Sequence, residues 1–254
     1  MTEPILQVKD LNKSFGGVIA TDHLDFDVKN GEIHAVIGPN GAGKTTFVAQ
    51  IAGMLSPDSG AIIFSGQEIN TFTAPQRSHL GLARSFQITS VFPNFSALEN
   101  VALSIQAHAG HSFRFWTPAS TDPELAQPAR KMLEQVGLGG RAMSLAGNLA
   151  HGEQRQLEIA MALATNPKML LLDEPTAGMG SEESENMRQF LRNLKGDYSM
   201  LLIEHDMDTV FSLADRVTVL VYGRSIATGS PDEIRSNAEV RAAYLGEDEA
   251  QYNA

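Results

Sequence analysis

The stretch Gly38–Thr46, with the sequence GPNGAGKTT, decides the fold class of this 254-residue chain. It fits the pattern G-x-x-x-x-G-K-[ST], and it lies between an apolar run at Ile33–Ile37 and a helix-like stretch at Lys44–Ala52. This order of strand, glycine-rich turn and helix makes the pattern specific for phosphate binding. Glycines let backbone N–H groups turn inward around phosphate oxygens, and the helix N-terminus adds a partial positive charge. The sequence therefore predicts a nucleotide-binding loop formed by Gly38, Pro39, Asn40, Gly41, Ala42, Gly43, Lys44, Thr45 and Thr46.

An acidic pair further along the chain supplies the second half of the expected site. Leu170–Asp173 is an apolar run that ends in an acid, and Glu174 follows it. Alone, such a pair is more often a helix N-terminus, but ligands of open α/β sheets bind at the C-terminal ends of strands. We expect Lys44 to reach the β- and γ-phosphates of ATP, and Thr45 and Asp173 to hold Mg²⁺. Glu174 is placed to polarise the attacking water.

Strand-like and helix-like segments alternate at both ends of the chain, which indicates an α/β domain with a mainly parallel sheet. Apolar runs at Met169–Leu172 and Met200–Ile203 are typical of buried parallel strands. Val217–Val221 is a further candidate strand, and Ser181–Lys195 has the apolar spacing of a helix.

The middle of the chain has a mostly helical pattern, in Leu98–His108, Pro123–Val136 and Gly152–Ala164. We therefore expect one domain over residues 1–254. In it, a helical subdomain at 97–165 is inserted into an α/β core of residues 1–96 and 166–254.

Charge and composition exclude several classes of protein. The net charge is −11 and no Lys/Arg cluster occurs, whereas duplex-binding proteins need a basic face, so we expect no nucleic-acid partner. The chain has no cysteine, which fits a reducing compartment. Its N-terminal residues lack the pattern of a secretory signal, and no apolar run reaches the ~20 residues that span a bilayer.

Three further segments separate the classes of phosphate-loop proteins, which include kinases, GTPases and transport ATPases. Arg84–Gln87 (RSFQ) stands at the entry to the helical region, Leu149–Gln154 (LAHGEQ) opens a predicted helix, and Ile203–Asp206 (IEHD) ends a predicted strand. With the loop and the acidic pair, this order of motifs resembles the ABC ATPase family along nearly the whole chain. The resemblance implies a P-loop NTPase with a mainly parallel sheet core, an N-terminal antiparallel β part and an inserted helical subdomain.

The resemblance also implies roles for single residues. Glu174, Gln87 and His205 are expected to be catalytic, with Gln87 touching both Mg²⁺ and the attacking water, and His205 contacting the γ-phosphate. Phe15 matches the aromatic residue that stacks on adenine in this family. From the sequence alone, a buried core phenylalanine is an equal alternative for Phe15.

Leu149–Gln154 occupies the place of the family signature, usually written LSGGQ. Ala150 stands where serine is usual and His151 where the first glycine is usual. Because the segment opens a helix, backbone N–H groups of Ala150, Gly152 and Glu153 are expected to face a γ-phosphate despite the lost hydroxyl. Gly180 replaces a polar residue that helps to couple the two sites of the family's dimers.

A closer resemblance concerns the transported solute. The variant signature, the stretch Val91–Val101 and the ending Ala242–Glu247 resemble the ATPases of branched-chain amino acid importers. This resemblance implies a second, non-identical ATPase subunit in a head-to-tail dimer, membrane-spanning permease subunits, and indirectly a periplasmic or extracellular solute-binding protein. It also implies a peripheral location on the cytoplasmic face of the inner membrane.

Other functions remain open at this point. Importers of urea, short amides and aromatic acids, and exporters of lipopolysaccharide, use similar ATPases. A soluble ABC ATPase that acts as a mechanical clamp is a different class, but such proteins carry two cassettes or long coiled coils. A small-molecule kinase is disfavoured by Gln87, the signature segment and His205.

Overall fold

A computed structural model describes residues 3–85, 91–108 and 122–243 of the chain. It consists of two compact units: unit 1 comprises Met1–Arg77 and Leu194–Ala254, and unit 2 comprises Ser78–Asn193. The helical segment expected at 97–165 lies wholly inside unit 2, which also contains two strands and most of a further helix.

Unit 1 holds most of the strands. Its strands are β1 (Leu6–Phe15), β2 (Val18–Val28), β3 (Ile33–Ile37), β4 (Ser59–Phe64), β5 (Gln67–Glu68), β8 (Ser199–Ile203), β9 (Arg216–Val221) and β10 (Arg224–Gly229). Its helices are α1 (Lys44–Ile51), α7 (Met207–Leu213) and α8 (Pro231–Ser236), and α2 (Ala74–His79) begins in it.

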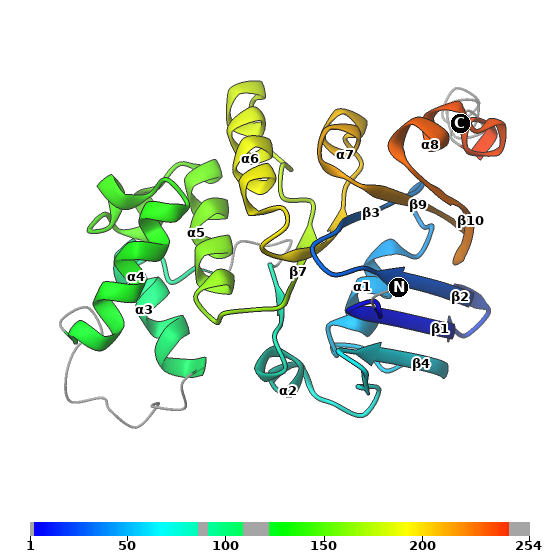
Figure 1. Cartoon of the computed structure of the whole chain (residues 1–254), viewed down its shortest axis with the longest axis horizontal. Helices are drawn as coiled ribbons and strands as arrows, with labels where there is room; N and C mark the ends of the chain where they lie inside the picture. Colours follow the sequence, from blue (N-terminus) through cyan, green and yellow to red (C-terminus); the bar gives the residue numbers. More distant parts are fainter. Residues whose placement is uncertain (1–2, 86–90, 109–121, 244–254) are drawn as a thin grey trace. The chain divides into compact units, whose positions relative to one another are not determined.

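These strands form an antiparallel sheet and a mainly parallel one. The antiparallel sheet has the order β2-β1-β4-β5, and Figure 1 shows β1, β2 and β4 side by side. In the other sheet β3 pairs in parallel with β8 on one side and with β9 on the other, and β10 continues antiparallel to β9. All five residues of β3 and of β8 are buried, which explains their largely apolar sequences.

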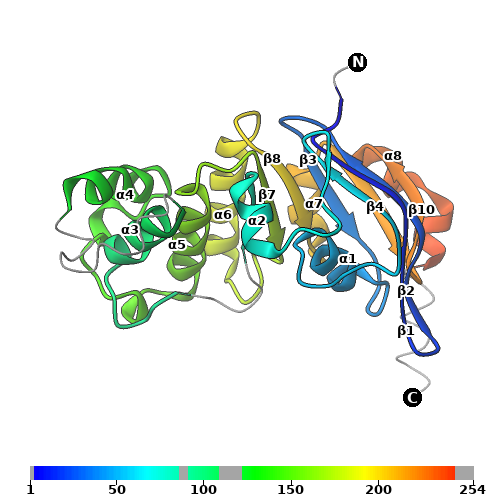
Figure 2. The same ribbon diagram turned by 90° about the horizontal axis from the view of Figure 1, so that it is seen from below.

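Unit 2 combines two parallel strands with a group of helices. Its elements are β6 (Leu82–Arg84), α3 (Ala97–His108), α4 (Pro123–Gln135), the 3₁₀ turns η1 (Gly139–Arg141) and η2 (Ala146–Asn148), α5 (His151–Leu163), β7 (Met169–Asp173) and α6 (Ser181–Leu194). Helices α3, α4 and α5 pack against one another, as Figures 1 and 2 show. Fully buried Val101, Leu133 and Leu157, one from each helix, form part of their common core.

The strands and helices expected from the sequence are confirmed to within one or two residues. For example, the helix expected at Pro123–Val136 is α4 at Pro123–Gln135. Its start is well defined, because the Asp122 side chain accepts a hydrogen bond from the N–H of Glu124 and Pro123 occupies the first helical position. The α/β fold with a mainly parallel sheet, an antiparallel N-terminal part and a helical insertion is likewise confirmed. None of the helices within the described residues is long and apolar enough to cross a membrane.

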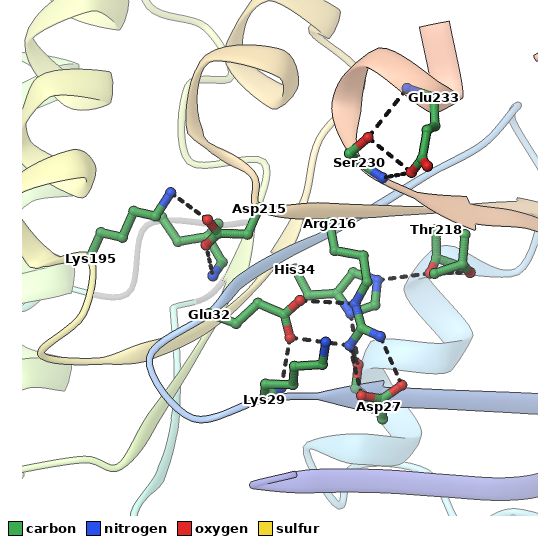
Figure 3. A network of polar contacts seen from close by, with 12 residues as sticks. Asp27, Lys29, Glu32, His34, Lys195, Asp215, Arg216, Thr218, Ser230 and Glu233 are labelled. Carbon is green, nitrogen blue, oxygen red and sulfur yellow. Dashed lines mark hydrogen bonds and ion pairs between the residues drawn. The ribbon is translucent and has the colours of Figure 1, made fainter. Parts of the chain in front are cut away.

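A partly buried polar network joins the two sheets of unit 1 (Figure 3). Arg216 on β9 forms ion pairs with Asp27 on β2, at 2.7 Å, and with Glu32 just before β3, at 2.9 Å. His34 on β3 lies beside it, with Nδ1 2.7 Å from the Asp27 carbonyl oxygen and Nε2 2.8 Å from the Thr218 hydroxyl. The carbonyl can only accept, so Nδ1 carries the proton and Nε2 accepts from Thr218. The network therefore holds His34 as a neutral imidazole.

His34 is expected to make the stability of the protein depend on pH. Burial, with the nearby Arg216 charge, lowers the pKa of His34 from 6.5 to about 3. Above pH 6.5 its contribution is fully present. As the pH falls from 6.5 toward 3, His34 binds a proton in the unfolded chain but not in the folded chain. The free energy of unfolding therefore decreases by about 1 kcal/mol per pH unit.

This effect is measured by urea unfolding of the wild type and of His34→Gln between pH 7.5 and 4.5. Other titrating groups contribute equally to both proteins, so the stability advantage of the wild type should shrink steadily below pH 6.5. A difference that does not change with pH would contradict a neutral His34.

Candidate nucleotide-binding and hydrolysis site

The glycines of the predicted phosphate loop are required by close backbone contacts. The loop runs from the end of β3 to the start of α1. A Cβ on Gly38, which has φ +154°, would lie 2.1 Å from the carbonyl oxygen of Leu220. A Cβ on Gly43, at φ +101°, would lie 2.0 Å from the carbonyl oxygen of Ala20. Gly41 also has a positive φ, +78°, but faces open space. The loop can thus take this path only with glycine at its two ends.

Hydrogen bonds fix the backbone of the loop against neighbouring strands of unit 1. The N–H of Gly223, in the turn between β9 and β10, donates to the carbonyl of Ala42 at 2.9 Å. The first helical bond of α1 runs from the N–H of Phe47 to the carbonyl of Gly43, at 2.8 Å. The N–H groups of the residues before Phe47 precede this first bond, as at any helix start, and such groups form an anion-binding site.

The side chain of Lys44 lies over this loop. Its ammonium group donates to the carbonyl of Gly38 and, at 2.9 Å, to that of Pro39. This places a full positive charge beside the N-terminus of α1. The charge of Lys44 and the N–H groups at the start of α1 together suit the phosphates of a nucleotide.

The far end of α1 is held by an arginine that sequence reasoning missed. The guanidinium of Arg77 is buried and donates to the last carbonyls of the helix, those of Gln50 at 2.6 Å and Ile51 at 2.7 Å. Burial lowers the pKa of Arg77 to about 10, so it remains charged at neutral pH. A cation at a helix C-terminus is favourable. Arg77 thereby anchors the helix that presents the phosphate loop.

Phe15 is an exposed residue of unit 1, at the end of β1. Half of it is accessible, 51%, and Lys13 Nζ lies 5.6 Å from the centre of its ring. The alternative of a buried core phenylalanine is therefore wrong. An exposed aromatic face at a strand end is available to stack on a planar base.

His205 follows β8, also in unit 1. Its side chain is 65% exposed, while the side chain of the preceding Glu204 is fully buried. Glu204 Oε2 accepts from the N–H of His205, at 3.1 Å, and of Asp206, at 3.4 Å. Asp206 in turn caps α7 by accepting from the N–H of Asp208, at 3.1 Å. Hydrogen bonds to Glu204 therefore fix the backbone at His205 and Asp206, while the side chain of His205 is largely exposed.

The acidic pair lies in unit 2, as the last residue of β7 and the residue after it. Asp173 is 3% exposed and Arg84 on β6 reaches its carboxylate at 3.0 Å. Glu174 has φ +47°, in the left-handed region that a non-glycine residue rarely adopts. Such strain is held in place only by surrounding structure and is common at functional sites.

Oxygen donors of the expected types are present for Mg²⁺. Thr45 offers a hydroxyl in the first turn of α1, and Asp173 offers a buried carboxylate. Proteins usually bind Mg²⁺ through one or two such groups together with phosphate oxygens of the substrate. Each of the two groups, taken within its own unit, is therefore of a type that Mg²⁺ accepts, and Asp173 is paired with Arg84 in this structure.

The signature segment, Leu149–Gln154, opens α5 as expected. Ala150 is the N-cap and provides no side-chain acceptor, so the cap does not occupy the N–H groups of the first turn. Glu153 takes over part of the capping: its carboxylate accepts from the N–H of Ala150, at 2.9 Å, and from Arg141, at 3.0 Å. His151 lies against Gly178, where an added Cβ would be 3.4 Å from the imidazole.

The structure thus distributes the predicted residues over the two units. Phe15, the loop of Gly38–Thr46 and His205 belong to unit 1. Asp173, Glu174 and the signature segment belong to unit 2. Gln87 lies outside the described residues, so its predicted role stays a prediction. Glu204 was missed although its position, an acid directly before the histidine and after an apolar strand, was visible in the sequence.

Comparisons with known proteins agree with this set of motifs. Residues 21–177 match the family model described as ABC transporter, and residues 224–250 match the model described as branched-chain amino acid ATP-binding cassette transporter. The chain is 37% identical to the high-affinity branched-chain amino acid transport ATP-binding protein BraF of Pseudomonas aeruginosa, over 97% of this chain and 100% of BraF. LivG of Escherichia coli, which has the same description, is also 37% identical over the same shares of the two chains.

Solved structures give the same result. The crystal structure of the ADP conformation of an ATP-binding cassette of an ABC transporter is 30% identical, with a TM-score of 0.86, and covers 96% of this chain and 100% of that one. A nucleotide-free ATP-binding cassette from an ABC transporter is also 30% identical, with a TM-score of 0.84, and covers 95% of this chain and 99% of that one. The chain therefore belongs to the ABC transporter family and is one of its nucleotide-binding ATPase subunits.

Proposed function

We propose that this chain drives the import of branched-chain amino acids by binding and hydrolysing ATP. The observation that carries the proposal is the 37% identity to BraF over 97% of the chain, together with the match of residues 224–250 to the branched-chain amino acid transporter model. The BraF match covers both units, so it is not limited to the widespread nucleotide-binding motifs.

In the proposed site, unit 1 binds the nucleotide. The loop from Gly38 to Thr46 surrounds the phosphates, Lys44 neutralises the β- and γ-phosphates, and Phe15 stacks on adenine. His205 contacts the γ-phosphate. The exposed faces of Phe15 and His205 and the fixed backbone of the loop support these roles.

The remaining groups of this proposal act in hydrolysis and in binding Mg²⁺. Glu174 polarises the attacking water, and Gln87 helps to orient it. Thr45 and Asp173 hold Mg²⁺, which would neutralise charge on the phosphate oxygens when it is bound. Backbone N–H groups at Ala150, Gly152 and Glu153 bind the γ-phosphate of the ATP that a second ATPase subunit carries. Ala150 has no side-chain acceptor that competes for the N–H groups of Gly152 and Glu153, which supports their part in this role, whereas the Ala150 N–H donates to Glu153 in this structure.

Transport requires partners, and we propose permease subunits in the membrane, a second and non-identical ATPase subunit in a head-to-tail dimer, and a solute-binding protein outside the cell. The chain would then lie peripherally on the cytoplasmic face of the membrane. We also propose that residues 97–165 act as a helical subdomain that passes ATP-driven motion to the permease, with residues 1–96 and 166–254 as the core.

The test is uptake by proteoliposomes that contain the chain with its second ATPase subunit and its permeases. ATP should drive uptake of labelled leucine, and unlabelled isoleucine and valine should compete, whereas urea, acetamide and benzoate should not. Uptake of urea, amide or aromatic acid instead of leucine would refute the assigned solute. ATP hydrolysis that continues without uptake of any solute would refute transport.

A further inference from the structure

A buried ion pair links β6 to the end of β7 within unit 2. Arg84 Nη2 lies 3.0 Å from Oδ2 of Asp173, and the two side chains are only 13% and 4% exposed. The strands are parallel neighbours in which Arg84 pairs with Leu171, two residues before Asp173. Residues two apart on a strand point to the same face of a sheet, so Arg84 and Asp173 share one face. The register therefore brings a long cationic side chain to the carboxylate that is expected to bind Mg²⁺.

The contact uses only one of the two carboxylate oxygens of Asp173. Arg84 donates to Oδ2, and in the part of the chain that the structure describes no hydrogen bond reaches Oδ1. Burying a carboxylate is costly unless its charge is paired, and the guanidinium pairs it without using both oxygens. A partner that fixes one oxygen also restricts rotation of the carboxylate. Oδ1 thus has a defined position and is the oxygen that can coordinate a metal ion.

We propose that Arg84 is a positioning residue for Mg²⁺, because it holds Oδ2 of Asp173 and leaves Oδ1 to the ion. Carboxylates that bind metals are commonly held by a further hydrogen bond, and loss of such a partner lowers metal affinity about 10–100-fold. The charge of Arg84 acts in the opposite direction, because a cation near the site repels Mg²⁺. The sign of the change in metal affinity therefore separates a positioning residue from a competing cation. The inference rests on the proposed role of Asp173 in binding Mg²⁺.

The test is Mn²⁺ binding, measured by electron paramagnetic resonance on the full chain with a non-hydrolysable ATP analogue, so that no turnover is needed. Mn²⁺ accepts the same oxygen ligands as Mg²⁺. Arg84→Met should raise the Kd for Mn²⁺ about tenfold or more, because the Asp173 carboxylate loses its support. Arg84→Lys keeps a charged donor but not the planar guanidinium, and should raise this Kd only about threefold. A Kd that is unchanged or lower in Arg84→Met would overturn the proposal.

Two controls separate the effect on the metal from other effects. Arg130→Met removes one positive charge from an exposed position on α4 of the same unit, and should leave the Kd for Mn²⁺ unchanged. Binding of the ATP analogue in EDTA should be equal in the wild type and in Arg84→Met, since Asp173 acts through the ion. A loss of nucleotide binding in EDTA as large as the loss of Mn²⁺ binding would contradict the positioning role.

A double-mutant cycle shows whether Arg84 acts through Asp173. Asp173→Asn should itself weaken Mn²⁺ binding, and Arg84→Met added to Asp173→Asn should cause no further loss. A further loss as large as that in the wild-type background would refute the inference. If Asp173→Asn binds Mn²⁺ as tightly as the wild type, Asp173 is not a ligand and the proposed site itself fails. If Asp173→Asn weakens binding but Arg84→Met does not, only the inference on Arg84 fails.

Thermal unfolding shows whether each variant is folded. Arg84→Met is the variant most at risk, because it removes the cation that pairs with a buried carboxylate, whereas the double variant removes both charges. If Arg84→Met does not fold, Arg84→Lys decides in its place. A Kd for Mn²⁺ in Arg84→Lys that is equal to or lower than the wild-type value would then overturn the proposal.

Discussion

Replacing Glu174 with glutamine is expected to reduce ATP turnover by about a hundredfold or more while ATP binding is retained. The amide has the shape of the carboxylate but cannot take a proton from water, and general-base catalysis contributes about 10²–10⁴-fold. The nearly isosteric change should also leave the strained backbone at Glu174, with φ +47°, in place. The measurements are phosphate release and the Kd of a fluorescent ATP analogue.

Glu134→Gln is the matched control for this variant, because Glu134 is an exposed glutamate on α4. It should hydrolyse ATP at the wild-type rate. A Glu174→Gln protein that turns over ATP at a near wild-type rate would remove Glu174 from the chemistry. A loss of ATP binding in parallel with turnover would show that Glu174 acts in binding instead.

The second large effect is expected for Gly43→Ala in the phosphate loop. The added methyl group would lie 2.0 Å from the carbonyl oxygen of Ala20, so the loop or β2 must move. The N–H groups that follow Gly43 would then leave their positions around the phosphates. We expect the Kd for ATP to rise about a hundredfold or more, which corresponds to ~3 kcal/mol.

Gly41→Ala separates the contact from the backbone conformation. Gly41 also has a positive φ, +78°, but no atom lies within 4 Å of the position that the added methyl group would take, so only the conformational cost of about 1–2 kcal/mol applies. Titration calorimetry should therefore show a much smaller loss of affinity for Gly41→Ala than for Gly43→Ala. Equal losses would mean that the close contact with Ala20 does not shape the loop.

Sequence reasoning was strongest where one local pattern carries the structure. Fully buried strands such as β3 and β8 are largely apolar runs. The glycine-lysine pattern between β3 and α1 is typical of a phosphate-binding loop. The position of helix α4 can be predicted because residues close together in the sequence determine both its start and its apolar spacing.

Features that depend on contacts between residues far apart in the sequence could not be predicted from the sequence. Arg77 is a charged residue in a short helix, and nothing nearby in the sequence indicates that it is buried against the end of α1. The pairing of Arg84 with Asp173 joins β6 to β7 across a long stretch of chain. The exposure of Phe15 depends on the β1–β2 hairpin, so the sequence left two alternatives for it open.

The altered signature is better explained by the structure than by the sequence. Loss of the serine at Ala150 removes a hydroxyl, yet the start of α5 remains ordered because Glu153 bonds back to the Ala150 N–H and to Arg141. Gly180 donates its N–H to Glu183 at 3.3 Å, so this position still has a polar backbone contact.

The coupling of hydrolysis to transport is the central claim, and one measurement tests it most directly. This is the ATPase rate of the assembled complex in proteoliposomes, with the solute-binding protein present, before and after addition of leucine. We predict that leucine raises the rate severalfold and that a complex carrying Glu174→Gln shows neither the basal nor the stimulated activity. An ATPase rate that is changed neither by leucine nor by any of the alternative solutes would contradict the account.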